Sequence, residues 1–266
     1  MKHRRPVFIL LALTVLVLAS LACSLFGATA PTQPPPPPPT QEVAPPVSEP
    51  PTAEPPAAQD TPTAEPPPAT PTQASQQFFT EEFDNGAGNW SPFVTNGELS
   101  QLDFTAKDSH LTFDLKQKQL WTYALYTPQT YTDVRIDTKV DNLGQNENNI
   151  SLICRYDKER GWYEFSVANS GLYWIYFGKW DSNGTTASYA VIADGGSNNI
   201  KQGLAINTYA MTCKGNTISA YINDKEIKRV DDNSHGLREG QIGIGVSSFR
   251  RLPIEVEFDW VKISQP

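Results

Sequence analysis

The sequence is poor in the residues that most often carry catalytic chemistry. It contains only three histidines and three cysteines among 266 residues. His110 and His235 have no partner residues at metal-ligand spacing. Neither a G-x-S-x-G nucleophile elbow nor a His-Glu-x-x-His motif occurs. We therefore predict no catalytic residue set and no metal site from these motifs.

An excess of positive charge is also missing. The chain has 21 Lys and Arg against 29 Asp and Glu, a formal net charge of −8 at pH 7, and no stripe of basic residues. Nucleic-acid binding depends on clustered cations that neutralise phosphates. The composition therefore excludes nucleic acid as a partner.

Amphipathic helices are absent from the pattern after Gln77, where hydrophobicity alternates with a period of two. Val134, Ile136, Thr138 and Val140 alternate with charged residues, as in a half-buried strand. Turn signals such as Asn169-Ser170-Gly171 separate about a dozen strand candidates. This spacing predicts an all-β fold, a two-sheet antiparallel jelly-roll sandwich.

Proline divides the chain into three parts, because 18 of its 23 prolines lie between Ala28 and Gln77. The segment 28–77 contains no aromatic residue and repeats the hexapeptide P-T-A-E-P-P, so it has little to bury. As polyproline II, 50 such residues could reach on the order of 150 Å. We predict a signal or anchor at 1–27, a disordered stalk at 28–77 and one folded domain at 78–266.

The N-terminal segment has the pattern of an export signal, with basic residues before the apolar run Val7–Ala22. Three fates stay open. Ser20-Leu21-Ala22-Cys23 resembles a bacterial lipobox, although Ser replaces the usual Leu, and would make Cys23 a lipidation site. Ala28-Thr29-Ala30 offers an ordinary cleavage site and hence secretion, and an uncleaved segment is long enough to span a bilayer. Each fate places the domain outside the cytoplasm, and the first and third tether it to the membrane.

Lipidation of Cys23 would leave an even pair of cysteines in an oxidising compartment. Cys154 and Cys213 are then expected to form a disulfide, which requires their two strands to be neighbours. The alternative is a pair of small buried thiols.

Several segments of the domain resemble concanavalin A-like jelly rolls, a superfamily that includes laminin-G-like modules, lectins, family 16 glycosidases and 3-keto-disaccharide hydrolase-like domains. The opening Phe79–Asp84 with Gly88-Asn89-Trp90 is similar to "F-x-x-x-F-D … G-W". The other matching segments are Leu152–Asp157, Gly161–Phe165, Ser170–Trp174, Asn216–Lys225, Gly240–Ile244 and Phe258–Val261. The resemblance covers the whole domain at the level of fold and implies either a non-catalytic binding module or a hydrolase.

A glycosidase needs two carboxylates held a few ångströms apart. The family 16 pattern E-x-D-x-E has its nearest match in Glu255-Val-Glu257-Phe-Asp259, but the residue types stand in a different order and on the closing strand. Such alternation is also typical of a solvated strand face. We therefore favour a binding module and keep the hydrolase as the alternative.

Aromatic residues are unusually dense between Trp162 and Trp180. If Tyr163 and Tyr173 face the core, strand alternation turns their neighbours outward. We predict one shallow groove for an extracellular glycan or cell-wall polymer, with Trp174 as the main stacking platform and the lining Arg155, Asp157, Trp162, Glu164, Trp174 and Tyr176. The alternative is that these aromatics pack beneath a loop.

No cofactor is expected, and the alternative is a structural calcium ion. Asp141–Asn149 is rich in oxygen ligands but lacks the EF-hand spacing. The family resemblance nominates Asp84 and Asp259 for such an ion.

Overall fold

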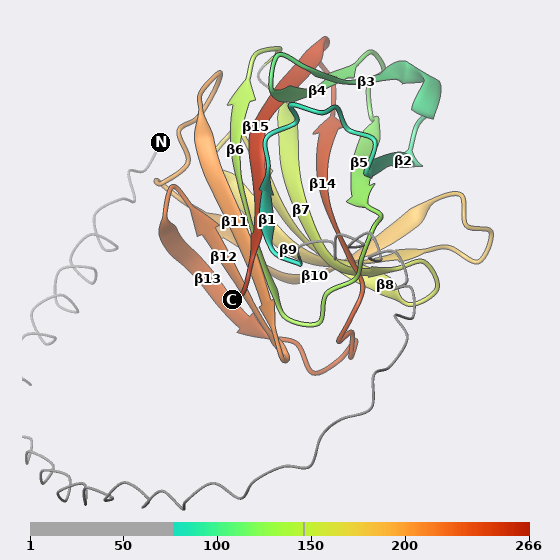
Figure 1. Ribbon diagram of the computed structural model, residues 1–266, viewed down its shortest axis with the longest axis vertical. Coiled ribbons are helices and arrows are strands. Elements are labelled where there is room, and N and C mark those ends of the chain that lie inside the picture. The colour runs from blue at the N-terminus through green and yellow to red at the C-terminus, as the bar shows by residue number, and fades with distance from the viewer. Residues whose placement is uncertain (1–76, 146) are drawn as a thin grey trace, which may run out of the picture. The chain divides into compact units, whose positions relative to one another are not determined.

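The computed structural model describes residues 77–145 and 147–266, which form two antiparallel sheets packed face to face (Figure 1). One sheet has eight strands in the order β13-β12-β11-β6-β15-β4-β3, with β1 also paired to β15. The other has seven strands in the order β10-β9-β8-β7-β14-β5-β2. Consecutive strands pair at the sheet edges, whereas central neighbours such as β6 and β15, or β7 and β14, are distant in sequence, as expected of a jelly roll. The prediction of an all-β two-sheet sandwich is confirmed.

The strands of the eight-stranded sheet are β1 (Phe79–Glu81), β3 (Leu102–Lys107), β4 (His110–Leu115), β6 (Val134–Asn142), β11 (Asn207–Lys214), β12 (Thr217–Ile222), β13 (Lys225–Asp231) and β15 (Ile254–Ser264). Those of the seven-stranded sheet are β2 (Trp90–Asn96), β5 (Trp121–Tyr126), β7 (Asn148–Asp157), β8 (Gly161–Ala168), β9 (Leu172–Trp180), β10 (Ala187–Gly196) and β14 (Gln241–Ser248). A 3-10 turn, η1 (Leu99–Gln101), precedes β3.

Side-chain alternation places the core between the sheets. In β6, Val134, Ile136, Thr138 and Val140 are buried while the charged residues that alternate with them are half-buried, as the pattern predicts. In β8, by contrast, all eight residues are buried. The inner face of β8 therefore packs in the core, and side chains outside the core cover its outer face.

A disulfide joins the two sheets. Cys154 on β7 and Cys213 on β11 are bonded, with their Cα atoms 6.6 Å apart. The disulfide prediction is confirmed, but the expectation that the two strands are neighbours is wrong. β7 and β11 belong to opposite sheets, so the bond crosses the core instead of joining adjacent strands.

The predicted signal, Cys23 and most of the stalk lie outside the described residues, so lipidation and anchoring stay predictions from the sequence. Across 77–145 and 147–266, no helix is long and apolar enough to cross a membrane.

Candidate functional site

A cleft of about 380 Å³ opens on the outer face of the seven-stranded sheet. We call it the aromatic cleft. Six strands and the residue after β14 contribute its lining: Trp121, Tyr123, Asn149, Glu164, Ser166, Trp174, Tyr176, Tyr189, Ser247 and Phe249. It is the size of a small-molecule site, and rings form its walls.

The register of β8 and β9 produces the centre of this cleft. Glu164 lies opposite Tyr176 and Ser166 lies opposite Trp174, so these four side chains leave the same face of the sheet. The prediction that Trp162, Glu164, Trp174 and Tyr176 share one face is therefore confirmed for this hairpin. Tyr173, which precedes Trp174 on β9 and points to the opposite face of the sheet, is buried in the core.

Trp162 has the predicted parity but no exposed surface. Its ring packs against those of Tyr156, Trp180 and Tyr189, with centroids 5.5, 5.9 and 5.9 Å away. A Cβ on Gly178, directly opposite Trp162, would lie 2.3 Å from the indole, so glycine there makes room for the ring. The expectation that Trp162 lines the groove is wrong, because the surrounding aromatic side chains leave none of its surface exposed.

Trp174 and Tyr176 form the accessible part of the aromatic face. Both are half-buried, and their rings lie 6.3 Å apart with an interplanar angle of 7°. Two nearly parallel rings spaced by two residues along a strand present adjacent flat surfaces. Trp174 is not buried between the sheets, so its outward orientation is confirmed.

Glu164 forms the buried polar floor of the cleft, with 3% of its surface exposed. Ser151 donates a hydrogen bond of 2.6 Å to Oε1, Tyr123 donates at 3.1 Å to Oε2, and the Trp162 indole donates at 3.3 Å to Oε2. Burial raises the pKa of the Glu164 carboxyl above its ordinary value, and these hydrogen bonds oppose the shift. Burial and the Glu164 charge in turn raise the pKa of Tyr176 to about 12.

We expect Glu164→Gln to change how stability depends on pH. Because the folded-state pKa is raised, the unfolded chain ionises first, so this carboxyl makes the native protein less stable as pH rises from the unfolded pKa through the folded one. Glutamine does not ionise. The free energy of unfolding of the variant, relative to that of the parent, should therefore be higher at pH 8 than at pH 4. Urea unfolding of both proteins at the two pH values measures this difference. A constant difference would show that Glu164 has the same pKa in both states.

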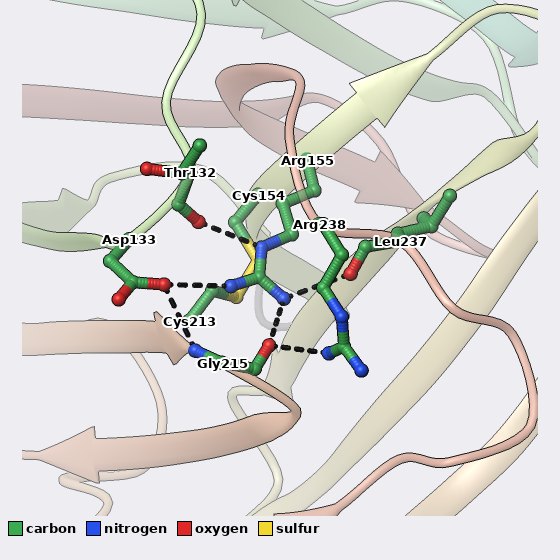
Figure 2. A network of polar contacts seen from close by, with 8 residues as sticks. All are labelled: Thr132, Asp133, Cys154, Arg155, Cys213, Gly215, Leu237 and Arg238. Atoms are coloured by element: carbon green, nitrogen blue, oxygen red, sulfur yellow. Dashed lines mark hydrogen bonds and ion pairs between the residues drawn. A yellow bond between two sulfur atoms is a disulfide. The ribbon is translucent and has the colours of Figure 1, made fainter.

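Arg155 does not line the cleft, which corrects the sequence prediction. A bulge in β7 after Cys154 gives Arg155 a left-handed backbone (φ 56°) and shifts the strand's alternation. The side chain is 1% exposed and donates to the carbonyl oxygens of Thr132, Gly215 and Leu237. Figure 2 shows this guanidinium beside the disulfide, also paired with the Asp133 carboxylate at 3.2 Å. Arg155 is therefore a structural residue.

Asp157 is not in the aromatic cleft either. Its carboxylate accepts hydrogen bonds from the backbone N–H groups of Glu159 and Arg160, both at 2.9 Å, and from the Arg160 side chain. These bonds lower the pKa of Asp157, the Arg160 N–H being the largest cause. The residue caps the β7–β8 turn and lines a different, polar depression. The same bulge explains the error, because it brings Tyr156 to the outer face against Trp162.

Sequence reasoning missed the part of the cleft that comes from strands outside the β8–β9 hairpin. Trp121 and Tyr123 on β5 and Tyr189 on β10 complete the walls. The Tyr123 hydroxyl bonds both Glu164 and the Tyr189 hydroxyl, which is also 2.8 Å from the Thr95 hydroxyl. The W-x-Y spacing at 121–123 places both rings on one face of a strand, so the sequence contained a signal for this part of the cleft. Their position opposite β9 depends on the strand order.

The carboxylates of Glu255-Val-Glu257-Phe-Asp259 lie on β15, in the eight-stranded sheet, and do not line the aromatic cleft. Asp259 is paired with Lys139 at 2.6 Å and with His110 at 3.5 Å. Asp84, the other residue nominated for calcium, accepts a hydrogen bond from Ser109. Among the described residues, no group of three or more His, Cys, Asp or Glu side chains is placed to hold a metal ion.

Comparison with known proteins shows the fold. No protein-family model matches the chain, and no curated protein matches it. Among solved structures, a β-glucanase from Bacillus licheniformis is 13% identical with a TM-score of 0.52, over 72% of this chain and all of that one. A mixed-linkage glucan family 16 glycoside hydrolase from Bacteroides ovatus, solved with a product, is 10% identical with a TM-score of 0.52, over 70% and 99% of the two chains.

A Bacillus subtilis protein of unknown function with a galectin-like fold is 11% identical with a TM-score of 0.51, over 70% of this chain and 94% of that one. At these identities the likeness concerns architecture alone. The domain therefore has a concanavalin A-like jelly-roll fold, as its sequence resemblance implied.

Proposed function

We propose that this protein is a non-catalytic module that binds a glycan chain in the aromatic cleft. The observation that carries the proposal is the accessible pair Trp174 and Tyr176, standing above a buried polar floor formed by Glu164. Sugar rings offer apolar C–H faces that pack on aromatic rings and hydroxyls that need hydrogen-bond partners. The cleft supplies both kinds of contact. The comparison structures that act on glucans support the proposal through their shared fold alone.

The rigidity of the cleft also favours binding. Trp162, Tyr123 and Ile153 form a closed cluster beneath it, into which Trp121, Trp180 and Tyr189 pack. Glu164 is held by three donors, so its carboxyl cannot turn away from the cleft. A site whose side chains are already ordered loses little entropy when ligand binds.

A glycoside hydrolase is the second candidate, because Glu164 is buried with a raised pKa, as a general acid requires. Both classes of glycosidase need a second carboxyl about 5–10 Å away. Among the described residues lining the aromatic cleft, Glu164 is the one acid. Release of reducing ends from a bound glucan, lost in Glu164→Gln, would support the hydrolase over the binding module.

We expect Trp174→Ala to weaken glycan binding by about 30-fold or more, which is about 2 kcal/mol, because the main stacking surface is removed. The free energy of unfolding should change much less, since the ring is partly exposed. Isothermal titration with an oligosaccharide identified on a glycan array measures the affinity. Trp260→Ala is the matched control, because Trp260 is a half-buried Trp in the eight-stranded sheet. Equal losses in both variants, or none in Trp174→Ala, would contradict the proposed site.

A further inference from the structure

A second cleft adjoins the aromatic cleft, and we call it the polar cleft. It has a volume of about 680 Å³ and shares Asn149, Trp174 and Phe249 with the first. Its other lining residues are Glu147, Asn148, Ala168, Asn169, Ser170, Arg250 and Arg251. Because Trp174 borders both clefts, a chain-like ligand stacked on this ring would extend into the polar cleft.

Two buried polar atoms in the polar cleft have no hydrogen-bond partner among the described residues. Asn148 is 2% exposed, and its Oδ1 accepts from Asn169 while its Nδ2 has no acceptor. The Oε2 atom of Glu147 is likewise buried and has no donor. Buried polar groups are normally paired, so this donor and acceptor mark places where a ligand's oxygen and hydroxyl fit.

The charges of the polar cleft favour an anion. Glu147 is already compensated, since its Oε1 accepts from Arg250 at 2.6 Å. Arg251 is exposed and forms no ion pair with any described residue. The cleft therefore has a net positive charge on a chain whose formal charge is −8. Guanidinium groups match the two oxygens of a carboxylate or sulfate.

We propose that the polar cleft binds an anionic sugar residue of the glycan, with its acidic group at Arg251 and its hydroxyl and ring oxygens at Glu147 and Asn148. The inference rests on the proposed function, because Trp174 holds the neighbouring sugar. It adds that the natural ligand is an acidic polysaccharide carrying carboxylates or sulfates.

Matched ligands test the charge directly. Titration of the full-length protein compares oligogalacturonate and oligomannuronate with their methyl esters, which keep the rings and remove the charge. We expect the acids to bind about tenfold more tightly than the esters, the effect of one charge-assisted hydrogen bond. Arg251→Ala should remove that preference, while Arg251→Lys should retain part of it. Added NaCl should reduce it, because Arg251 is exposed.

Arg229→Ala is the control, since it removes an exposed arginine from β13 on the other sheet. Sulfated dextran oligosaccharides distinguish a sulfate from a carboxylate as the acidic group of the ligand. If these alone bind in an Arg251-dependent way, the acidic group is a sulfate. Equal affinity for acids and esters, with no effect of Arg251→Ala, would overturn the inference. Trp174-dependent binding of neutral glucans would then leave the proposed function standing. If neither neutral nor acidic saccharides bind, both proposals fail.

Discussion

Replacing both Cys154 and Cys213 with alanine should lower the free energy of unfolding by about 4 kcal/mol. The bond closes a loop across a sequence separation of 59, and in the chain-entropy model a loop of this length restricts the unfolded chain by that amount. Because it joins the two sheets, its loss also removes a covalent link across the core. Urea unfolding of the oxidised parent and the double variant measures the difference.

The reduced parent protein provides the control for the alanine substitutions themselves. Reduction breaks the same bond without removing either sulfur, so both samples should lose similar stability. A loss below about 1 kcal/mol in both would show that the bond does not restrict the unfolded chain. A loss in the alanine variant alone would assign the effect to packing of the two buried side chains.

Replacing Arg155 with methionine should cost about 3 kcal/mol, the second-largest effect we expect. Methionine retains much of the aliphatic stem but leaves the carbonyl oxygens of Thr132 and Leu237 without their donor. Each buried group left unpaired costs about 1–3 kcal/mol. Gly215 still accepts from Arg238, and Asp133 is exposed enough to be hydrated, so these two partners add less.

The matched control is Arg229→Met, which removes an exposed arginine paired with Glu226 on β13 and should leave the free energy of unfolding nearly unchanged. Chemical denaturation of both variants at neutral pH compares them. Arg155→Lys should remain well below the parent in stability, because an ammonium cannot reproduce the planar fork that reaches three loops. Similar stability of Arg155→Met and the parent would contradict the structural role.

The disulfide and the Arg155 side chain stabilise the same region. The losses in the free energy of unfolding caused by removing each of them should therefore not add. The guanidinium bonds Gly215, two residues after Cys213, and Arg155 itself follows Cys154 (Figure 2). Once one restraint is lost, the other has less native structure to stabilise.

The aromatic cleft shows how much of a site strand alternation can predict. The outward face of the β8–β9 hairpin follows from the period-two pattern and the short turn at Asn169-Ser170-Gly171, both of which are local. Whether an outward residue is accessible is not local. Trp162 and Trp174 share a face, yet Trp162 is buried because Tyr156, Trp180 and Tyr189 meet above it.

The sequence alone determined the fold class and the shared face of Glu164, Trp174 and Tyr176, because these depend on local alternation and short turns. It predicted the disulfide but left two buried thiols as the alternative, since the packing of the two sheets brings Cys154 to Cys213. Only the tertiary structure decided the roles of Arg155 and Asp157. The left-handed bulge at Arg155 is stabilised by carbonyls from three loops far apart in sequence, and no local pattern encodes that network. The strand order likewise brings β5 to the cleft, since β14 pairs with both β5 and β7, which are distant from it along the chain.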